Sequence, residues 1–487
     1  MNPTTTRDAR SHGMSTGERH PAALPMLFFT EMWERFSYYG MRALLVLYLV
    51  NALDYRRADA LALYGTYTGL VYLTPIFGGY IADRYLGYRK AILVGGIVMA
   101  MGHFAMAFPA LLHLALGLLI IGNGFFKPNI STLLGSLYGE NNPRRDSGFT
   151  IFYMGINLGA LLSPLIAGTL GEKIGWHWGF ASAGVGMLFA VSQFVVSQHR
   201  LGTAGLPAGK KTLDARDWIE VFLISALSIP LVYAVRGAWH AIVPLWDSVA
   251  TDAKVGTAVA ACVAFLAWQR RSCTRPEWHR VLAIVIMGVF VIFFWMGFEQ
   301  AGGTMNLFAD KLTDRSLLGW EMPASYFQGV NPLLIVLLGP LFSMLWTRWD
   351  RSRLALSTPA KMGIGMLILG AGFVILAIAQ GRAEALGKVG PQWLLSVYLL
   401  HTIGELCLSP IGLSMVTKLA PVRLAALMMG IWFGASAIAN YLAGILESLL
   451  AGSGIPLYWF LVASSAGAGI LLLLLSPWLV RLMRGGA

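Results

Sequence analysis

The sequence predicts an all-α membrane protein with fourteen transmembrane helices, and its composition and apolar runs predict this class. Hydrophobic residues make up 56% of the 487 residues and charged residues only 12%, whereas soluble domains are about 25% charged. The mean hydropathy is +0.64. A soluble core could not hide so much apolar surface behind so little polar covering, so the composition excludes an ordinary soluble protein.

Each predicted span is a mostly apolar run of about 20 residues or more, the length that crosses a bilayer as a helix. In chain order, the spans lie at 24–52, 61–82, 90–108, 112–138, 148–170, 177–198, 218–238, 245–268, 280–308, 324–346, 360–380, 392–418, 424–449 and 456–480. The short connections leave no room for a large soluble domain. Residues 1–20 are polar and lack the apolar core of a signal peptide, which predicts a cytoplasmic tail.

The spans divide into two groups of six, which predicts two helical bundles. We expect an amino-terminal bundle over residues 21–200 and a carboxy-terminal bundle over 277–483. A linker and two inserted helices occupy 201–276, and because we assign none of the functional intramembrane charges to this pair we expect a peripheral hairpin without a role in the chemistry. Two six-helix bundles with the substrate between them at mid-membrane is a common transporter plan.

The net charge of +12 is explained by membrane topology and does not indicate a nucleic-acid partner. With the amino terminus in the cytoplasm, 24 of the 36 Lys and Arg residues lie on the cytoplasmic side and nine on the opposite side. Basic residues concentrate in cytoplasmic loops. This bias predicts a multi-pass protein of a bacterial-type inner membrane, with both termini cytoplasmic and the lipid bilayer as its partner.

Seven charged residues lie inside the apolar spans of the two bundles, away from the span ends, and are the strongest functional candidates. A charge at the bilayer centre costs about 2.5–3.5 kcal/mol, so such residues face a partner or a watery cavity. Three cations nearly balance four anions, which predicts one mutually neutralising cluster along a central path. The seven are Glu31, Glu34, Arg35, Arg42, Lys127, Glu299 and Glu405.

The first span carries most of these charges on one helical face. Glu31, Glu34, Arg35, Tyr38 and Arg42 follow a spacing of three or four residues, which places them on one stripe. An acid paired with Arg stays ionised, whereas an acid that loses its partner in an apolar site takes a proton. The stripe therefore favours a proton-driven switch; the alternative is a static ladder of salt bridges between helices.

Residues 31–40 read E-x-x-E-R-F-x-Y-Y-G, which resembles the first-helix signature of the proton-dependent oligopeptide transporter family (POT/PTR), a branch of the major facilitator superfamily. The resemblance covers essentially residues 25–480 and implies the major facilitator fold. Six further segments match family motifs: GGYIADRYLGYRK (78–90), GNGFFKPNIS (122–131), FTIFYMGINLGALLSP (149–164), FFWMGFEQ (293–300), GVNPLLIVLLGP (329–340) and GELCLSPIGLSM (404–415).

The resemblance implies a symporter that imports di- and tripeptides with protons by alternating access, as a monomer and without a cofactor. Arg35 and Lys127 are candidates for the peptide carboxylate, and Glu405 is the candidate for its ammonium group. Ser409, one turn after Glu405, is a weaker candidate. The resemblance adds residues that line the pocket or bond the peptide backbone: Tyr39, Tyr72, Tyr153, Asn157, Trp295, Asn331 and Trp432.

For proton coupling, the resemblance points to Glu31, Glu34 and Arg35, together with Glu299. We expect Arg42 to exchange with Glu299, and Lys127 to exchange with Glu405. Animal members carry a histidine on the second helix where this sequence has Gly65. Carboxylates must therefore carry the coupling alone.

The segment 78–90 resembles the superfamily's loop between its second and third helices. Its glycines would let two helices approach closely, and Asp83 would lie at a helix amino terminus beside Arg84, Arg89 and Lys90. The helix dipole and these bases favour an acid there. By analogy with the superfamily, we expect Asp83 and Arg84 to form a conformational latch that does not touch substrate.

Two alternatives to a peptide symporter remain open on the sequence. The same fold could carry nitrate or another solute, as plant relatives do, although the complete Glu-x-x-Glu-Arg element favours peptide. A membrane-embedded enzyme or a channel is the second alternative. The chain has no nucleophile motif, and Cys262, Cys273 and Cys407 make no metal spacing, so we expect neither an enzyme nor a metal site.

Overall fold

The computed structural model describes residues 20–138, 142, 144–206, 212–247, 260, 264, 267, 270–271, 273–317, 319–352 and 355–485. The predicted amino-terminal tail, apart from its last residue, and most of the predicted span 245–268 lie outside the described residues.

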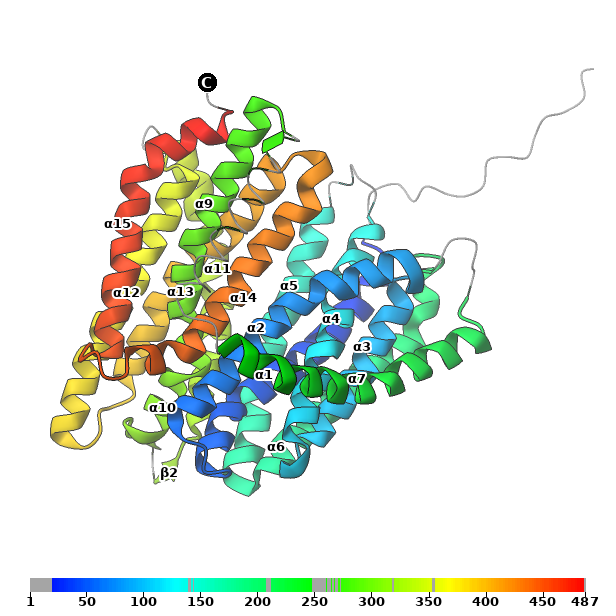
Figure 1. Ribbon diagram of the computed structural model, residues 1–487, viewed down its shortest axis with the longest axis horizontal. Helices are drawn as coiled ribbons and strands as arrows, with labels where there is room; N and C mark the ends of the chain where they lie inside the picture. The colour runs from blue at the N-terminus through cyan, green and yellow to red at the C-terminus, as the bar shows by residue number, and fades with distance from the viewer. Residues whose placement is uncertain are drawn as a thin grey trace, which may run out of the picture.

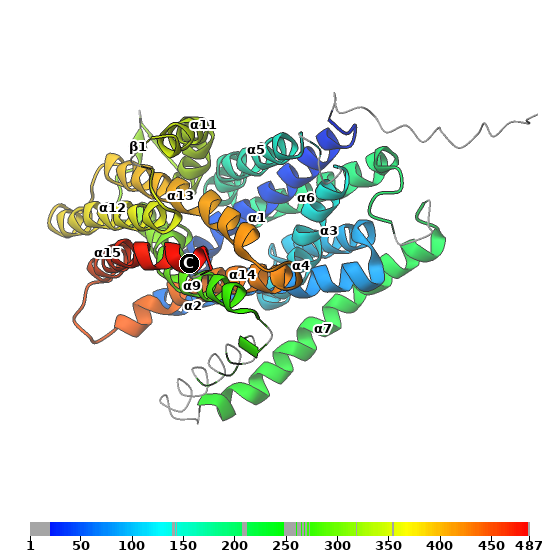
Figure 2. The ribbon, with the colours of Figure 1, turned by 90° about the horizontal axis from the view of Figure 1, so that it is seen from above.

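The amino-terminal half forms a bundle of six helices, seen in blue and cyan in Figures 1 and 2. Helix α3 packs on α4 and α6, α1 packs on α5 and α6, and α2 packs on α4. The helices are α1 (Leu24–Asn51), α2 (Arg57–Ile81), α3 (Tyr88–Ala105), α4 (Leu112–Ser136), α5 (Arg145–Ser163) and α6 (Trp176–Ser197). Helix α2 continues as a π-helical turn (Ala82–Leu86), and α5 as two such turns (Pro164–Gly168 and Leu170–Ile174).

The carboxy-terminal half forms a second bundle, in which α12 packs on α13 and α15 while α9 packs on α14 and α15. Its long helices are α9 (Arg275–Phe298), α11 (Val330–Asp350), α12 (Thr358–Leu386), α13 (Gln392–Leu419), α14 (Ala425–Leu450) and α15 (Leu457–Met483). Between α9 and α11 lie the short helix α10 (Thr304–Lys311), the strands β1 (Ser316–Leu317) and β2 (Trp320–Glu321), which pair antiparallel, and a 3₁₀ turn (Ala324–Gly329).

The all-α membrane fold class is confirmed. Eleven helical stretches of the described chain are long and apolar enough to cross a membrane. Helices α1 and α3 also fall on predicted spans; α1 carries the charged stripe, and α3 begins with Arg89 and Lys90. Most of the eighth predicted span lies outside the described residues, and the exact domain boundaries stay a prediction.

The ninth predicted span, 280–308, lies within one described helical stretch, Arg275–Lys311, that is long and apolar enough to cross a membrane, but its α-helix is interrupted at Glu299. Helix α9 ends at Phe298, a 3₁₀ turn covers Glu299–Gly302, and α10 follows. Two glycines at the break weaken the helix, and a side chain on Gly302 would overlap the hydroxyl of Tyr64. The break places the Glu299 carboxylate against the amino-terminal half.

Glycines allow the helices to approach until their backbones touch. A Cβ atom on Gly78 of α2 would overlap the carbonyl group of Gly124 on α4. Across the two halves, a Cβ atom on Gly65 of α2 would lie 2.6 Å from the Cα atom of Gly444 on α14. Helices α2 and α14 therefore meet in backbone contact across the two halves.

The first inserted helix, α7 (Ala215–Asp247), lies along the outside of the amino-terminal bundle, as Figure 2 shows. It packs against α3 and α4. Its buried residues follow one narrow stripe, while its apolar side chains on the other faces are exposed in the described part of the helix. The buried residues are Asp217, Val221, Ser225, Ser228 and Val232. This placement agrees with a peripheral position.

We predict that Gly78→Ala destabilises the protein, because the added methyl group meets backbone that cannot move aside. Overpacking of this kind costs about 1–3 kcal/mol, so the midpoint of thermal unfolding in detergent should fall by several degrees. Gly467→Ala is the matched control, because a Cβ atom there has no neighbour within 4 Å and alanine favours a helix. An unchanged midpoint for Gly78→Ala would contradict the packing described.

Candidate functional site between the two bundles

Arg35 is the centre of the charged face of α1 and holds both acids of the motif. Its Nη2 donates to Oε1 of Glu34 at 2.6 Å, and its Nε donates to Oε2 of the same carboxylate. The Nε atom also lies 3.2 Å from Oε1 of Glu31. All three side chains are at least 97% buried. One guanidinium is therefore shared by two carboxylates in an apolar setting.

Helix α4 brings Lys127 and Asn123 to the same region. The Nδ2 atom of Asn123 donates to Oε1 of Glu34 at 3.4 Å. The ammonium of Lys127 lies 4.8 Å from the ring centroid of Tyr72, which is a cation–π distance. No ion pair of the described residues includes Lys127, so the predicted exchange between Lys127 and Glu405 is not a contact in this conformation.

A second buried ion pair joins the two halves. The Nη2 atom of Arg42 donates to Oε2 of Glu299, and its Nε donates to the hydroxyl of Tyr64 at 2.7 Å. Arg42 and Glu299 are 7% and 3% exposed. Removing one partner of a buried pair leaves an uncompensated charge and typically costs about 3–5 kcal/mol. This pair therefore ties α1 to the break after α9.

Glu405 lies on α13 and is held by Asn331 of α11. The Nδ2 atom of Asn331 donates to Oε2 of Glu405 at 2.8 Å and to Oγ1 of Thr402 at 3.0 Å. Asn331 was expected to bond a peptide backbone, but in this conformation its amide is engaged by the carboxylate. Asn157, the other expected amide, donates to the carbonyl of Tyr153 on its own helix at 3.0 Å.

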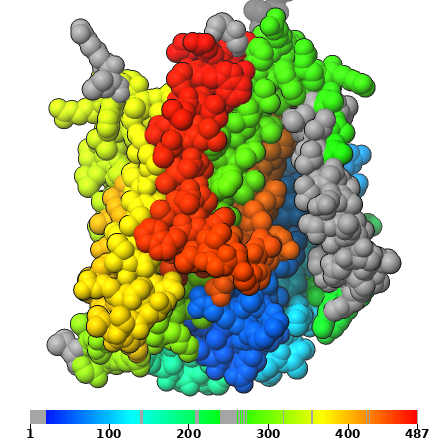
Figure 3. Space-filling model, turned by 60° about the vertical axis from the view of Figure 1, so that its left-hand side comes forward, coloured from blue at the N-terminus to red at the C-terminus, as the bar shows by residue number. Residues whose placement is uncertain are grey.

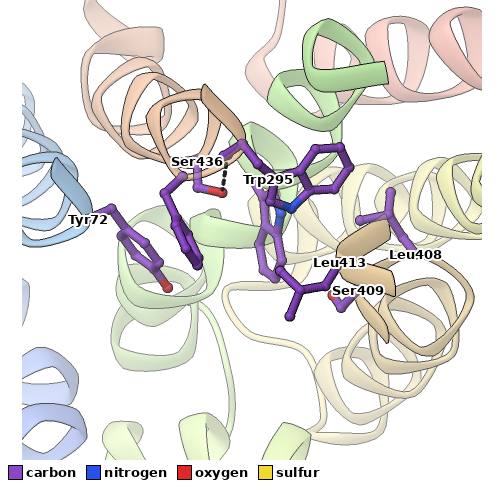
Figure 4. Close-up of a pocket in the computed structure, with 8 residues that line it drawn as sticks. Tyr72, Trp295, Leu408, Ser409, Leu413 and Ser436 are labelled. Carbon is purple, nitrogen blue, oxygen red and sulfur yellow. Dashed lines mark hydrogen bonds between the residues drawn. The ribbon is translucent and has the colours of Figure 1, made fainter. Parts of the chain in front are cut away.

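A cavity of about 150 Å³ lies where α2, α9, α13 and α14 meet (Figure 4). Four of the predicted substrate-binding residues line it: Tyr72, Trp295, Ser409 and Trp432. Four further residues complete the lining and were not predicted: Leu408, Leu413, Phe433 and Ser436.

The unpredicted lining residues carry no charge; Leu408 and Leu413 lie within the family motif at 404–415, whereas Phe433 and Ser436 lie outside the family motifs. Helical spacing could have found two of them, because Leu413 follows Ser409 by four residues and Ser436 follows Trp432 by four. Tyr39 and Tyr153 do not line this cavity; Tyr39 lies beside the guanidinium of Arg42, 5.9 Å from ring centroid to Cζ.

The halves are also joined at one end of the molecule, opposite the end where α15 finishes; we call it the distal end. In Figure 3 the segment between α14 and α15 lies directly over amino-terminal residues there. The Glu172 carboxylate accepts bonds from the backbone N–H groups of Ala324 (2.7 Å) and Ser325 (2.9 Å). Arg57 of α2 donates to Glu447 of α14 at 2.8 Å. The distal end is therefore closed by polar contacts.

The predicted latch segment is built differently from the expectation. Asp83 and Arg84 are exposed on the π-helical turn, and Arg89 and Lys90 bind groups other than Asp83. Arg89 donates to the carbonyls of Gly202 and Ala204, at 2.6 and 2.7 Å. The ammonium of Lys90 lies 2.6 Å from Glu220 and 3.2 Å from Asp217 on α7. These two bases anchor the linker and α7, and the latch role of Asp83 and Arg84 stays a prediction.

A model of the POT family matches residues 89–456. The chain belongs to the POT family. The family predicted from the motifs is thereby confirmed, and because POT proteins are transporters, the chain is a multi-pass membrane transporter and not an enzyme.

Individual relatives agree with this assignment over nearly the whole length. The chain is 36% identical to the peptide transporter YePEPT of Yersinia enterocolitica, over 88% of this chain and 87% of the relative. It is 33% identical to a di-/tripeptide transporter of Lactococcus lactis, over 95% and 96%. A crystal structure of a peptide transporter POT in complex with sulfate superposes with a TM-score of 0.81, at 35% identity and 96% coverage of each chain. The POT-family chain thus has the major facilitator fold.

We predict that Glu172→Ala destabilises the POT-family chain more than Glu447→Ala, although both remove a carboxylate that bridges the halves. The side chain of Glu172 is only 10% exposed. Its loss leaves the backbone N–H groups of Ala324 and Ser325 without their acceptor, at a cost of about 1–3 kcal/mol. The Arg57–Glu447 pair is partly exposed, and such pairs contribute about 0–1 kcal/mol. Thermal unfolding of the two variants in detergent measures the difference, and equal midpoints would contradict it.

Proposed function

We propose that this protein is a proton-coupled symporter that imports di- and tripeptides across the bacterial inner membrane by alternating access. The observation that carries the proposal is the pair of buried ion contacts on α1, where Arg35 holds Glu31 and Glu34 while Arg42 reaches Glu299 in the other half. The cargo is supported by the relatives named as a peptide transporter and a di-/tripeptide transporter.

The charges on the two halves suit the two ends of a peptide. Lys127 and Arg35, on the amino-terminal half, would bind the carboxylate, and Glu405, on the other half, would bind the ammonium group. Binding opposite ends from opposite halves draws the bundles together. The aromatic cavity beside Tyr72 and Trp295 offers apolar walls to peptide side chains without demanding one shape.

Proton coupling follows from the ion pair between the halves. A proton on Glu299 removes the charge that holds Arg42, so the contact between α1 and the break after α9 weakens. The distal end is then held closed by its remaining polar contacts, which include those of Glu172 and the Arg57–Glu447 pair, and it can open. Deprotonation restores the Arg42–Glu299 pair and closes the distal end again.

The sequence-based topology gives the motion a direction. With both termini cytoplasmic, the distal end faces the outside, so the conformation described here is closed outward. Peptide from outside enters only after the distal contacts open, and it leaves toward the cytoplasm after they re-form. One chain contains both halves, so we propose that a monomer is sufficient for transport.

Reconstitution into proteoliposomes tests the proposal. Uptake of a labelled dipeptide should be several-fold faster with an inward proton gradient than without one. Unlabelled tripeptides should compete with it, whereas nitrate and free amino acids should not. Uptake that ignores the proton gradient, or that nitrate inhibits, would refute the proposed coupling or the proposed cargo.

We predict that Glu299→Gln abolishes accumulation of dipeptide against its gradient. A glutamine cannot take up and release a proton, so protons can no longer break and restore the contact with Arg42. Concentrative uptake into proteoliposomes is the measurement. Glu447→Gln is the matched control, since it removes a partly exposed carboxylate that joins the halves at the distal end and should keep accumulation. A Glu299→Gln protein that accumulates dipeptide as the parent does would contradict the mechanism.

We predict a selective loss for Glu31→Gln and Glu34→Gln. Each should lose uphill uptake by at least tenfold, because the cluster around Arg35 no longer responds to protons. Counterflow exchange, which needs no net proton movement, should remain measurable. Equal loss of both activities would indicate a role in binding or folding and would contradict a role in coupling.

A further inference from the structure

Glu31 and Glu34 are not equivalent in the structure, although they share Arg35. Both oxygens of Glu34 accept bonds from Arg35, and Oε1 accepts a further bond from Asn123 at 3.4 Å. Glu31 has one oxygen 3.2 Å from Arg35. Its other oxygen, Oε2, is buried and has no hydrogen-bond partner within the described part of the chain. Glu34 is therefore the better-stabilised anion of the two.

The position of Asn123 is fixed by the helix packing on either side of it. A Cβ atom on Gly122 would lie 2.7 Å from the carbonyl oxygen of Gly95 on α3, and one on Gly124 would lie 2.9 Å from Cβ of Thr74 on α2. Helix α4 is thus held in backbone contact with α3 and α2 around Asn123. The Asn123 side chain, which is 1% exposed, reaches α1 on the remaining side.

The amide of Asn123 is engaged with Glu34 and not with its own helix. Its Nδ2 donates to the carboxylate, while its Oδ1 is buried without a hydrogen-bond partner among the described residues. By contrast, Asn129 on the same helix donates to the carbonyl of Phe125 at 2.7 Å, a local bond of the helix. A buried amide costs free energy unless it is bonded, so the contact with Glu34 is what Asn123 contributes at this site.

We propose that Asn123 is a positioning residue for proton coupling, which keeps Glu34 ionised on Arg35 and so directs the incoming proton to Glu31. The inference rests on the proposed symport. A hydrogen bond donated to a carboxylate favours its ionised form. A hydronium ion transfers its proton to the Glu31 carboxylate: one O–H bond of hydronium breaks, one O–H bond forms at Glu31, and water is released. Glu31 then loses its contact with Arg35, and Arg35 stays bound to Glu34.

The groups around Glu34 set the size of the expected effect. Glu31 and Arg35 lie on the same helix, Lys127 lies on α4, and Tyr67 faces the cluster from α2. Arg35 and Lys127 keep favouring ionised carboxylates when Asn123 is replaced. Loss of the amide should therefore shift the proton response without abolishing it.

The test is the pH dependence of dipeptide uptake in proteoliposomes at a fixed inward proton gradient, for Asn123→Leu and Asn123→Asp. Leucine has a similar size but lacks the hydrogen-bond donor. Aspartate has the same shape as asparagine but adds a further carboxylate beside Glu31 and Glu34. The pH at half-maximal uptake should rise by about one unit for leucine, the size expected for one bond to a charged group. It should rise further for aspartate, while counterflow stays within about twofold of the parent.

Asn129→Leu is the matched control, because it removes a buried amide from the same helix without touching a carboxylate; its half-maximal pH should equal that of the parent. Either Asn123 variant, folded and active with the parent's half-maximal pH, overturns the inference. A parent protein that ignores the proton gradient overturns the proposed symport instead, so the two failures are distinguished.

Discussion

The need to neutralise charge in an apolar interior governs this molecule. Arg35 and Arg42 lie seven residues apart on one face of α1, and each is buried against carboxylate. The first keeps its partners on its own helix, whereas the second takes Glu299 from the other half. Because a buried ion without a partner is costly, any change in the protonation of these acids must change which groups are held together. The same helix thereby serves as a proton sensor and as a tie between the bundles.

The rest of the fold makes this arrangement possible. Glycines bring α2 against α4 and α14 until backbones touch. The helix break after Phe298 delivers the Glu299 carboxylate to Arg42. The cavity lined by Tyr72, Trp295 and Trp432 lies between α2 of one half and α9, α13 and α14 of the other. A molecule bound there would contact both halves at once.

Much of this could be predicted from the sequence, because intramembrane charges are rare and helical spacing fixes their face. The charged stripe on α1 and the family motifs can be read directly from the sequence. The contacts between distant segments could not be predicted in this way. The amide of Asn331 contacts Glu405, Lys90 pairs with α7, and Glu172 caps a turn 152 residues further on. Such contacts depend on how loops and helix ends meet, which local periodicity does not encode.

The central claim is that protons control the closure between the halves. Its most direct test is a distance measurement by pulsed electron spin resonance between labels at Arg56, before α2, and Leu386, at the end of α12, both strongly exposed. In lipid nanodiscs, acidification from about pH 8 to pH 5 should shift the distance distribution to longer values. Identical distributions at the two pH values would contradict the account.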